Sequence, residues 1–127
     1  MQGTTRDGYR FEAGQRHVRK KSLTKLKDVV RGKTRRTRGD SLEMLVADLN
    51  RTLRGWFGYF KHAEPRIFDT IDGWIRRRLR SLLYKQQDKA SHHGISLAVN
   101  RRWPNAFFAN AGLFALHTAW QTARQPR

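Results

Sequence analysis

Residues 41–60, SLEMLVADLNRTLRGWFGYF, decide the fold of this chain. Their apolar side chains recur at steps of three and four, at Leu42, Leu45, Val46, Leu49, Leu53, Trp56, Phe57 and Phe60. On a helical wheel this set spans about 120°, the width of a stripe that faces a core. Asp40 or Ser41 can cap the first turn. The stretch therefore predicts an amphipathic helix with one face buried.

A shorter helix is predicted before it. Ser22 can act as the N-cap, the apolar residues that share a face are Leu23, Leu26 and Val30, and Gly32 ends the helix. Residues 33–39, KTRRTRG, contain no apolar side chain and are predicted to form a basic loop, either a solvated linker or a phosphate contact.

A third helix is predicted after Pro65, from Arg66 or Asp69 to Gln87. Its apolar residues again lie on one side: Ile67, Phe68, Ile71, Trp74, Ile75, Leu79 and Leu82. Residues 88–100 are predicted to form a loop, in which 95–99 could make a short strand or a helical turn. Pro104 can start a last helical segment, interrupted near Gly112, whose aromatic residues pack back on the helix pair.

The first 21 residues offer only Tyr9, Phe11 and Val18 for burial, too few to offset chain entropy, and are predicted to be a flexible basic arm. The sequence thus predicts an all-α fold, a small bundle of about three to four helices behind this arm. The expected division is an arm at 1–21, a helical domain at 22–88, and a C-terminal loop with an aromatic-rich helical segment at 89–127.

Charge and composition narrow the function. The chain has 27 Lys and Arg against 10 Asp and Glu, a net charge of +17, which makes nucleic acid the leading partner. The absence of Cys excludes disulfides, thiol catalysis and thiolate zinc sites. No apolar run approaches a membrane span and no secretory signal is visible, so we expect a cytoplasmic protein without a membrane partner. Neither His92 and His93 nor any other residues suggest a metal, a cofactor or an enzyme active site.

Cationic side chains on the predicted helices are the candidate RNA contacts. Arg76, Arg77 and Arg80 fall within about 100° of arc on the third helix and form a ridge of guanidinium groups, which suit phosphate. Cations of the second helix could extend this ridge into one patch. The predicted RNA-binding residues are Lys25, Arg35, Arg36, Arg51, Arg54, Lys61, Arg76, Arg77, Arg80 and Lys85.

Several residues keep two interpretations. Arg78 falls within the apolar arc, where it needs a partner such as Glu43, Asp48 or Asp72, or contacts the ligand directly. Gly55 and Gly58 weaken the second helix, and either a packing notch or the close approach of a ligand could explain them. Tyr59 and Trp103 either stack on unpaired bases or belong to the core, and Trp56 and Trp74 are expected in the core.

Two stretches carry a family resemblance: LNRTLRGWFGYF at residues 49–60 and FDTIDGWIRRRLR at residues 68–80. They resemble the maturase-specific domain of group II intron reverse transcriptases, also called domain X or the thumb. The resemblance covers about residues 22–88, and RRWPNAFFANAGLFAL at 101–116 is similar to the end of many bacterial members. It implies a helical thumb that grips intron RNA, with Arg51, Arg54, Arg76, Arg77 and Arg80 as contacts.

The resemblance also limits the activity. The chain contains no Y-x-D-D polymerase motif and no His, Asn and Cys nuclease framework. The resemblance therefore implies a non-catalytic module that assists splicing of structured group II intron RNA. Whether the chain is a fragment, a degenerate gene product or a free-standing module stays open. The alternatives are a helical module that binds DNA or an RNA–DNA duplex, and a thumb that docks a polymerase supplied in trans.

Overall fold

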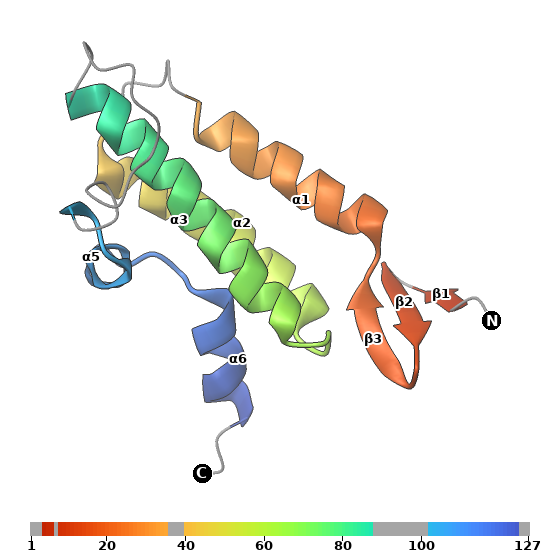
Figure 1. Ribbon diagram of the computed structural model, residues 1–127. Coiled ribbons are helices and arrows are strands. Elements are labelled where there is room, and N and C mark those ends of the chain that lie inside the picture. Colours follow the sequence, from red (N-terminus) through yellow and green to blue (C-terminus); the bar gives the residue numbers. More distant parts are fainter. Residues whose placement is uncertain (1–3, 7, 36–39, 88–101, 125–127) are drawn as a thin grey trace.

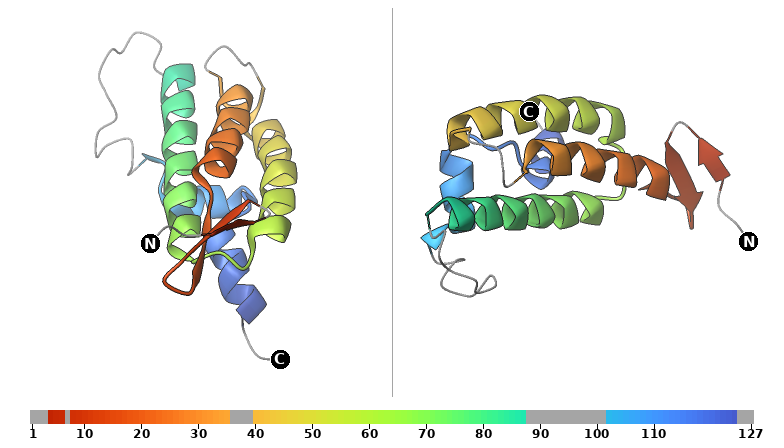
Figure 2. Two further views of the ribbon diagram at one scale, coloured as in Figure 1. Left: turned by 90° about the vertical axis from the view of Figure 1, so that its right-hand side faces the viewer. Right: turned by 90° about the horizontal axis from the view of Figure 1, so that it is seen from above.

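The computed structural model describes residues 4–6, 8–35, 40–87 and 102–124. Strands β1 (Thr4–Arg6), β2 (Tyr9–Glu12) and β3 (Gln15–Val18) precede helices α1 (Lys20–Lys33), α2 (Leu42–Phe60), α3 (Arg66–Gln87), α5 (Asn105–Asn110) and α6 (Leu116–Arg124). Helices α1, α2 and α3 lie alongside one another, with α5 and α6 on the side of the α2–α3 pair away from α1 (Figures 1 and 2). The predicted small helical bundle is confirmed.

The two long helices begin where their sequence signals place them. The Oγ of Ser41 accepts a hydrogen bond from the backbone N–H of Met44 at 3.3 Å, which caps α2, and α3 begins directly after Pro65. Helix α1 begins two residues before Ser22, at Lys20, without a side-chain cap. The reason is tertiary, because β3 leads straight into the helix and Arg19 already donates its N–H to the carbonyl of Gly8 at 2.8 Å.

The core lies between α1, α2, α3 and the C-terminal segment. Its fully or nearly fully buried side chains include Leu26, Val30, Leu49, Leu53, Phe68, Ile71, Ile75, Leu79, Phe108 and Leu116. The C-terminal aromatic residues therefore pack back on the helix pair, as their apolar character suggested. Trp56 and Trp74 are partly buried and pack against this core, so they lie at its edge and not among its fully buried side chains.

Two buried polar side chains fix the C-terminal segment to α2 and α3. The amide of Asn50 donates to the carbonyl of Gly112 at 2.8 Å and accepts from the N–H of Phe114 at 2.7 Å. The carboxylate of Asp72 accepts from the N–H groups of Leu116 and His117 at 2.9 and 3.0 Å, and so caps the start of α6. Burial raises the pKa of Asp72 above its ordinary value, although these two bonds act in the opposite direction.

The N-terminal residues form a sheet, so the prediction of a flexible arm over 1–21 is wrong for the strands. The antiparallel order is β1-β2-β3, with Tyr9 opposite Val18 and Glu12 opposite Gln15. The β2–β3 turn uses positive φ angles at Ala13 and Gly14. A sheet this small cannot bury a core of its own, and it is ordered here because Tyr9 docks on the bundle.

Tyr9 joins the sheet to the end of α2. Its ring meets the ring of Phe60 edge to face at 5.2 Å between centroids, and its hydroxyl donates to the carbonyl of Tyr59 at 3.0 Å. Gly8 is required beside it, because its φ is +83° and an added Cβ would lie 2.9 Å from the ring of Phe60. The apolar side chains of the N-terminal stretch are too few to form a core of their own, and packing against side chains of α2 buries Tyr9.

This docking predicts an alkaline loss of stability. Burial raises the pKa of Tyr9, so ionisation favours the unfolded chain. The contribution of the neutral Tyr9 to the free energy of unfolding is full below the ordinary tyrosine pKa of about 10. It is lost as the pH rises through the higher pKa of the folded state. We expect urea unfolding between pH 9 and 12, at constant ionic strength, to show this fall in the native chain and less of it in Tyr9→Phe. Equal pH profiles would show that Tyr9 is not buried as described.

Several predictions lie outside the described residues, namely the structure of the basic loop at 36–39, the loop at 88–100 and the pair His92 and His93. The division into segments 1–21, 22–88 and 89–127 stays a prediction. No helix within the described ranges is both long enough and apolar enough to cross a membrane. In the same ranges no three or more His, Cys, Asp or Glu side chains are grouped to hold a metal ion.

Candidate nucleic-acid interface

The outer face of α2 carries the predicted cations of that helix. Arg51, Arg54 and Lys61, which follows the last residue of α2, are all exposed, and Arg51 lies opposite the buried Leu49 and Leu53 on the helix. The guanidinium of Arg54 lies 5.6 Å from the ring centroid of Phe114. This contact holds the guanidinium against the C-terminal segment.

Gly55 and Gly58 lie among these cations, and both are exposed. Apart from its chain neighbours and the adjacent backbone of α2, a Cβ built on either residue meets no atom of the described chain within 4 Å. The packing notch that we weighed from the sequence is therefore wrong, because nothing in the bundle approaches these glycines. Each glycine costs the helix roughly 1 kcal/mol relative to Ala. We call the surface of Arg51, Arg54, Gly55, Gly58 and Lys61 the α2 face.

A groove continues this surface toward α1. It has a volume of about 580 Å³, and its lining includes Lys25 of α1 and Arg51, Gly55, Trp56 and Tyr59 of α2. Tyr59 is 54% exposed, so its ring is accessible for stacking. The structure thus brings Lys25 and Arg51 together, from helices that the sequence could not orient relative to each other. We call this surface the α1–α2 groove.

The arginines of α3 do not form one exposed ridge. Arg77 is exposed, Arg76 is partly buried, and Arg80 is only 8% exposed. The Nε of Arg80 donates to the carbonyl of Trp103 at 2.7 Å, and its Nη2 donates to the Oδ1 of Asn105 at 2.8 Å. Arg80 thus joins α3 to the start of α5, and the prediction that it belongs to a solvent-facing ridge is wrong.

The C-terminal segment explains this placement. It packs across one flank of α3 and covers Arg80. The Nε of Arg76 is also buried, without a hydrogen-bond partner in the described chain. Burial, together with the positive charges of Arg76 and Arg77, lowers the pKa of Arg80. A helical wheel identifies the flank that is least apolar, but a second segment can still cover that flank.

The single patch expected from α2 and α3 does not form. Both helices turn their apolar stripes to the shared core, so their exposed faces point to opposite sides of the bundle (Figure 2). Arg77 is exposed and lies opposite the buried Ile75 and Leu79 on α3, on the side of that helix that faces away from the core. Two separate cationic surfaces result, and that of α2 is the one with exposed glycines and an adjoining groove.

Arg78 has structural contacts. Its Nε donates to the Oγ1 of Thr34 at 2.8 Å, and its guanidinium lies 5.5 Å from the ring centroid of Trp74. Lys27 and Arg31 lie at 5.4 Å from the same ring. The partners that we considered from the sequence were carboxylates, and the hydroxyl of Thr34 was not among them. Nothing in the sequence shows that the end of α1 lies beside the middle of α3.

The remaining predicted contacts are spread out. Arg35 is exposed after α1, Lys85 is half-buried near the end of α3, and Arg36 lies outside the described residues. Trp103 is 3% exposed, so the core interpretation of this residue is confirmed and base stacking is not open to it. Lys25 was predicted from the sequence as a contact, and the structure places it in the same groove as Arg51.

Comparison with known proteins identifies the family. The family model described as "Group II intron, maturase-specific domain" matches residues 23–104, which include most of α1 and the whole of α2 and α3. Among curated proteins, no sequence matches this chain. The matched region spans most of the chain and contains the α2 face and both helices of the groove. The chain therefore belongs to the group II intron maturase-specific domain family, which connects it with group II intron splicing.

Proposed function

We propose that this chain binds structured group II intron RNA through the α2 face and the α1–α2 groove and helps that RNA to fold for splicing. The protein supplies cations and a shaped surface, and the RNA performs the chemistry of splicing. The proposed setting is the bacterial cytoplasm. The module is proposed to be non-catalytic and to need no cofactor.

One observation supports this function above the others: two exposed glycines stand in the C-terminal half of α2, close to three cations. No contact within the described chain requires Gly at these two positions. The missing side chains leave room for the backbone of a ligand to approach the helix. Arg and Lys beside that room can donate to phosphate oxygens, which fix the position of a nucleic acid without reading its sequence. Lys25 and Tyr59 extend the same surface into the groove.

A salt series tests this function. The full chain is titrated with a folded group II intron RNA, a scrambled RNA and a DNA duplex of equal length, from low to high salt. We expect the intron to be preferred at every salt concentration, because recognition of its shape adds to the ionic attraction that all three share. Equal affinities that collapse together would overturn the proposal, and a preference for the duplex would assign the chain to DNA.

Gly58 provides a test with opposite signs for stability and binding. Gly58→Ala is expected to stabilise the fold by about 1 kcal/mol, because it removes the cost of Gly in a helix. Gly58→Leu keeps most of that gain but fills the space above the helix, and it should weaken intron RNA binding roughly tenfold, or about 1.4 kcal/mol. Thermal unfolding and filter binding measure the two effects.

The matched control is Thr24→Leu, which adds the same side chain at an exposed position of α1 outside the groove. It should leave the affinity for intron RNA unchanged. If Gly58→Leu is folded and binds the intron like the native chain, the RNA does not approach the α2 face.

A further inference from the structure

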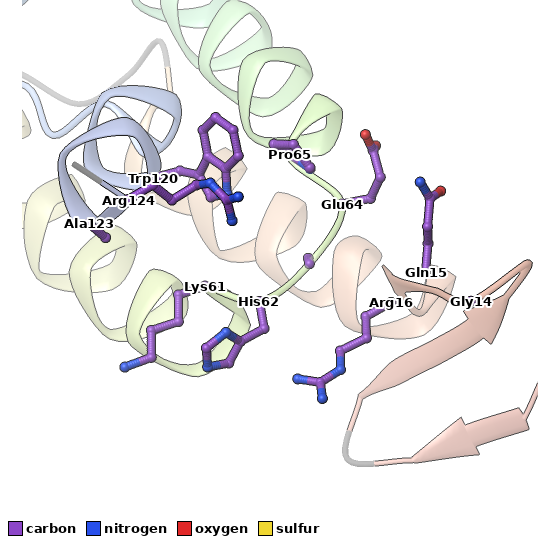
Figure 3. Close-up of a pocket in the computed structure, with 11 residues that line it drawn as sticks. Gly14, Gln15, Arg16, Lys61, His62, Glu64, Pro65, Trp120, Ala123 and Arg124 are labelled. Atoms are coloured by element: carbon purple, nitrogen blue, oxygen red, sulfur yellow. The ribbon is translucent and has the colours of Figure 1, made fainter. Parts of the chain in front are cut away.

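A second cationic pocket lies at the opposite end of α2 from its N-cap. Its volume is about 810 Å³. It is an open cavity bordered by the β2–β3 turn, the turn between α2 and α3, and α6. Its chemically active lining comprises Arg16, Lys61, His62, Glu64, Trp120 and Arg124 (Figure 3). We call it the hairpin pocket.

Backbone contacts hold the walls of this pocket together. The N–H of Glu64 donates to the carbonyl of Arg16 at 2.7 Å, which joins the hairpin to the α2–α3 turn. The Asp72 cap described above fixes the start of α6 on α3. The pocket is therefore formed in the folded chain by three segments that are far apart in the sequence.

Among the described residues that line the pocket, positive charges outnumber negative ones. Arg16, Lys61 and Arg124 line it and are all exposed. The one carboxylate among the described lining residues, that of Glu64, accepts from the N–H and the Nε of Arg66 at 3.2 and 3.1 Å. In Figure 3 the side chains of Arg16 and His62 extend to the same side of the α2–α3 turn. An anionic ligand would find donors from the hairpin and from the end of α2.

The wall formed by α6 adds a flat surface. The guanidinium of Arg124 lies 5.0 Å from the ring centroid of Trp120, over the indole. Nucleic-acid bases stack on aromatic rings and on guanidinium planes, so this pair can hold a base. The pocket thus combines phosphate donors and a stacking surface within a volume in the range of small-ligand sites.

We propose that the hairpin pocket binds one unpaired nucleotide of the bound RNA, with its phosphate between Arg16 and Lys61 and its base on the Arg124–Trp120 pair. A paired base inside a helix cannot enter a concave pocket of this size, whereas a nucleotide in a loop or a bulge can. The inference rests on the proposed function, which supplies the RNA. Much of the pocket lies outside residues 23–104 matched by the family model, because Arg16, Trp120 and Arg124 come from the hairpin and α6.

The test uses the full chain and a labelled five-nucleotide single strand, pentauridylate, as the probe. The double variant Arg16→Ala/Arg124→Ala should weaken binding of pentauridylate roughly tenfold, because it removes a phosphate donor and the stacking plane. The control is Arg10→Ala/Lys21→Ala, which removes the same charge from exposed positions on β2 and α1 that do not line the pocket. It should change the affinity by less than about twofold.

A second measurement locates the probe. Pentauridylate that carries 4-thiouridine should crosslink under long-wave light to peptides that contain His62 or Trp120. Crosslinks only elsewhere, or equal affinities of the pocket variant and its control, would overturn the inference. Displacement of the probe by hexaglutamate at equal concentration would also overturn it, because the pocket would then bind acidic chains in general.

The outcomes separate this inference from the proposed function. If the pocket variant binds pentauridylate normally while variants of the α2 face lose intron RNA, the pocket inference fails and the proposed function stands. If the pocket variant loses pentauridylate while variants of the α2 face keep intron RNA, the assignment of the α2 face fails and the pocket stands. Circular dichroism checks that both variants keep the helices.

Discussion

The double variant Arg51→Glu/Arg54→Glu is expected to bind folded group II intron RNA about a hundredfold more weakly than the native chain at physiological salt. Both side chains are exposed on the α2 face, so charge reversal replaces two phosphate contacts by repulsion. The slope of log affinity against log salt should fall by about two, one for each lost contact. Filter binding over a salt series measures both quantities.

The control for this variant carries the same change in net charge. Arg77→Glu/Lys21→Glu reverses two exposed cations on other helices, away from the α2 face. It should retain most of the affinity and show a smaller change in slope, because long-range attraction is screened beyond about 8 Å at physiological salt. An equal loss in both variants would mean that binding follows net charge, and the α2 face would lose its assignment.

Arg80→Met is expected to lower the free energy of unfolding by about 2 to 4 kcal/mol, since a buried carbonyl loses its charged donor. The substitution removes the bonds from Arg80 to the carbonyl of Trp103 and to Asn105, although methionine keeps much of the side-chain volume. Arg77→Met, on the exposed side of the same helix, should change the free energy by no more than about 0.5 kcal/mol. Urea unfolding followed by circular dichroism measures both.

These two arginines also test the structure against the sequence. A helical wheel places them near each other, and the family resemblance offers both as RNA contacts. A variant Arg80→Met that unfolds like the native chain but loses RNA binding would contradict the burial of Arg80. Loss of stability in Arg80→Met, without such loss in Arg77→Met, would support the role of Arg80 in holding the C-terminal segment.

The long helices could be predicted from their residues alone. Spacing of three and four at Leu45, Leu49 and Leu53 fixes a helix and its buried side, and Ser41 and Pro65 mark where α2 and α3 begin. The two stretches that resemble the maturase-specific domain lie on the same two helices, and the match of the family model confirms this resemblance. These signals are local, because periodicity and capping depend on residues within a few turns of one another.

The N-terminal sheet could not be predicted in the same way. Three apolar residues in a short basic stretch do not outweigh the entropy of ordering it. Tyr9 is ordered because Phe60 and the carbonyl of Tyr59 complete its environment, and both come from a helix about fifty residues later. The alternation of apolar and charged residues over Tyr9, Arg10, Phe11 and Glu12 was the available signal.

The sequence by itself determined the helices, the excess of positive charge and the family of this protein. Only the tertiary structure decided which cations are exposed and which lie together: it buried Arg80 against the C-terminal segment, left Arg77 exposed, and brought Lys25 and Arg51 to one groove. It also showed that Gly55 and Gly58 face open space. The physical reason is that periodicity fixes the direction of a side chain relative to its own helix, whereas exposure depends on every segment that packs against that helix.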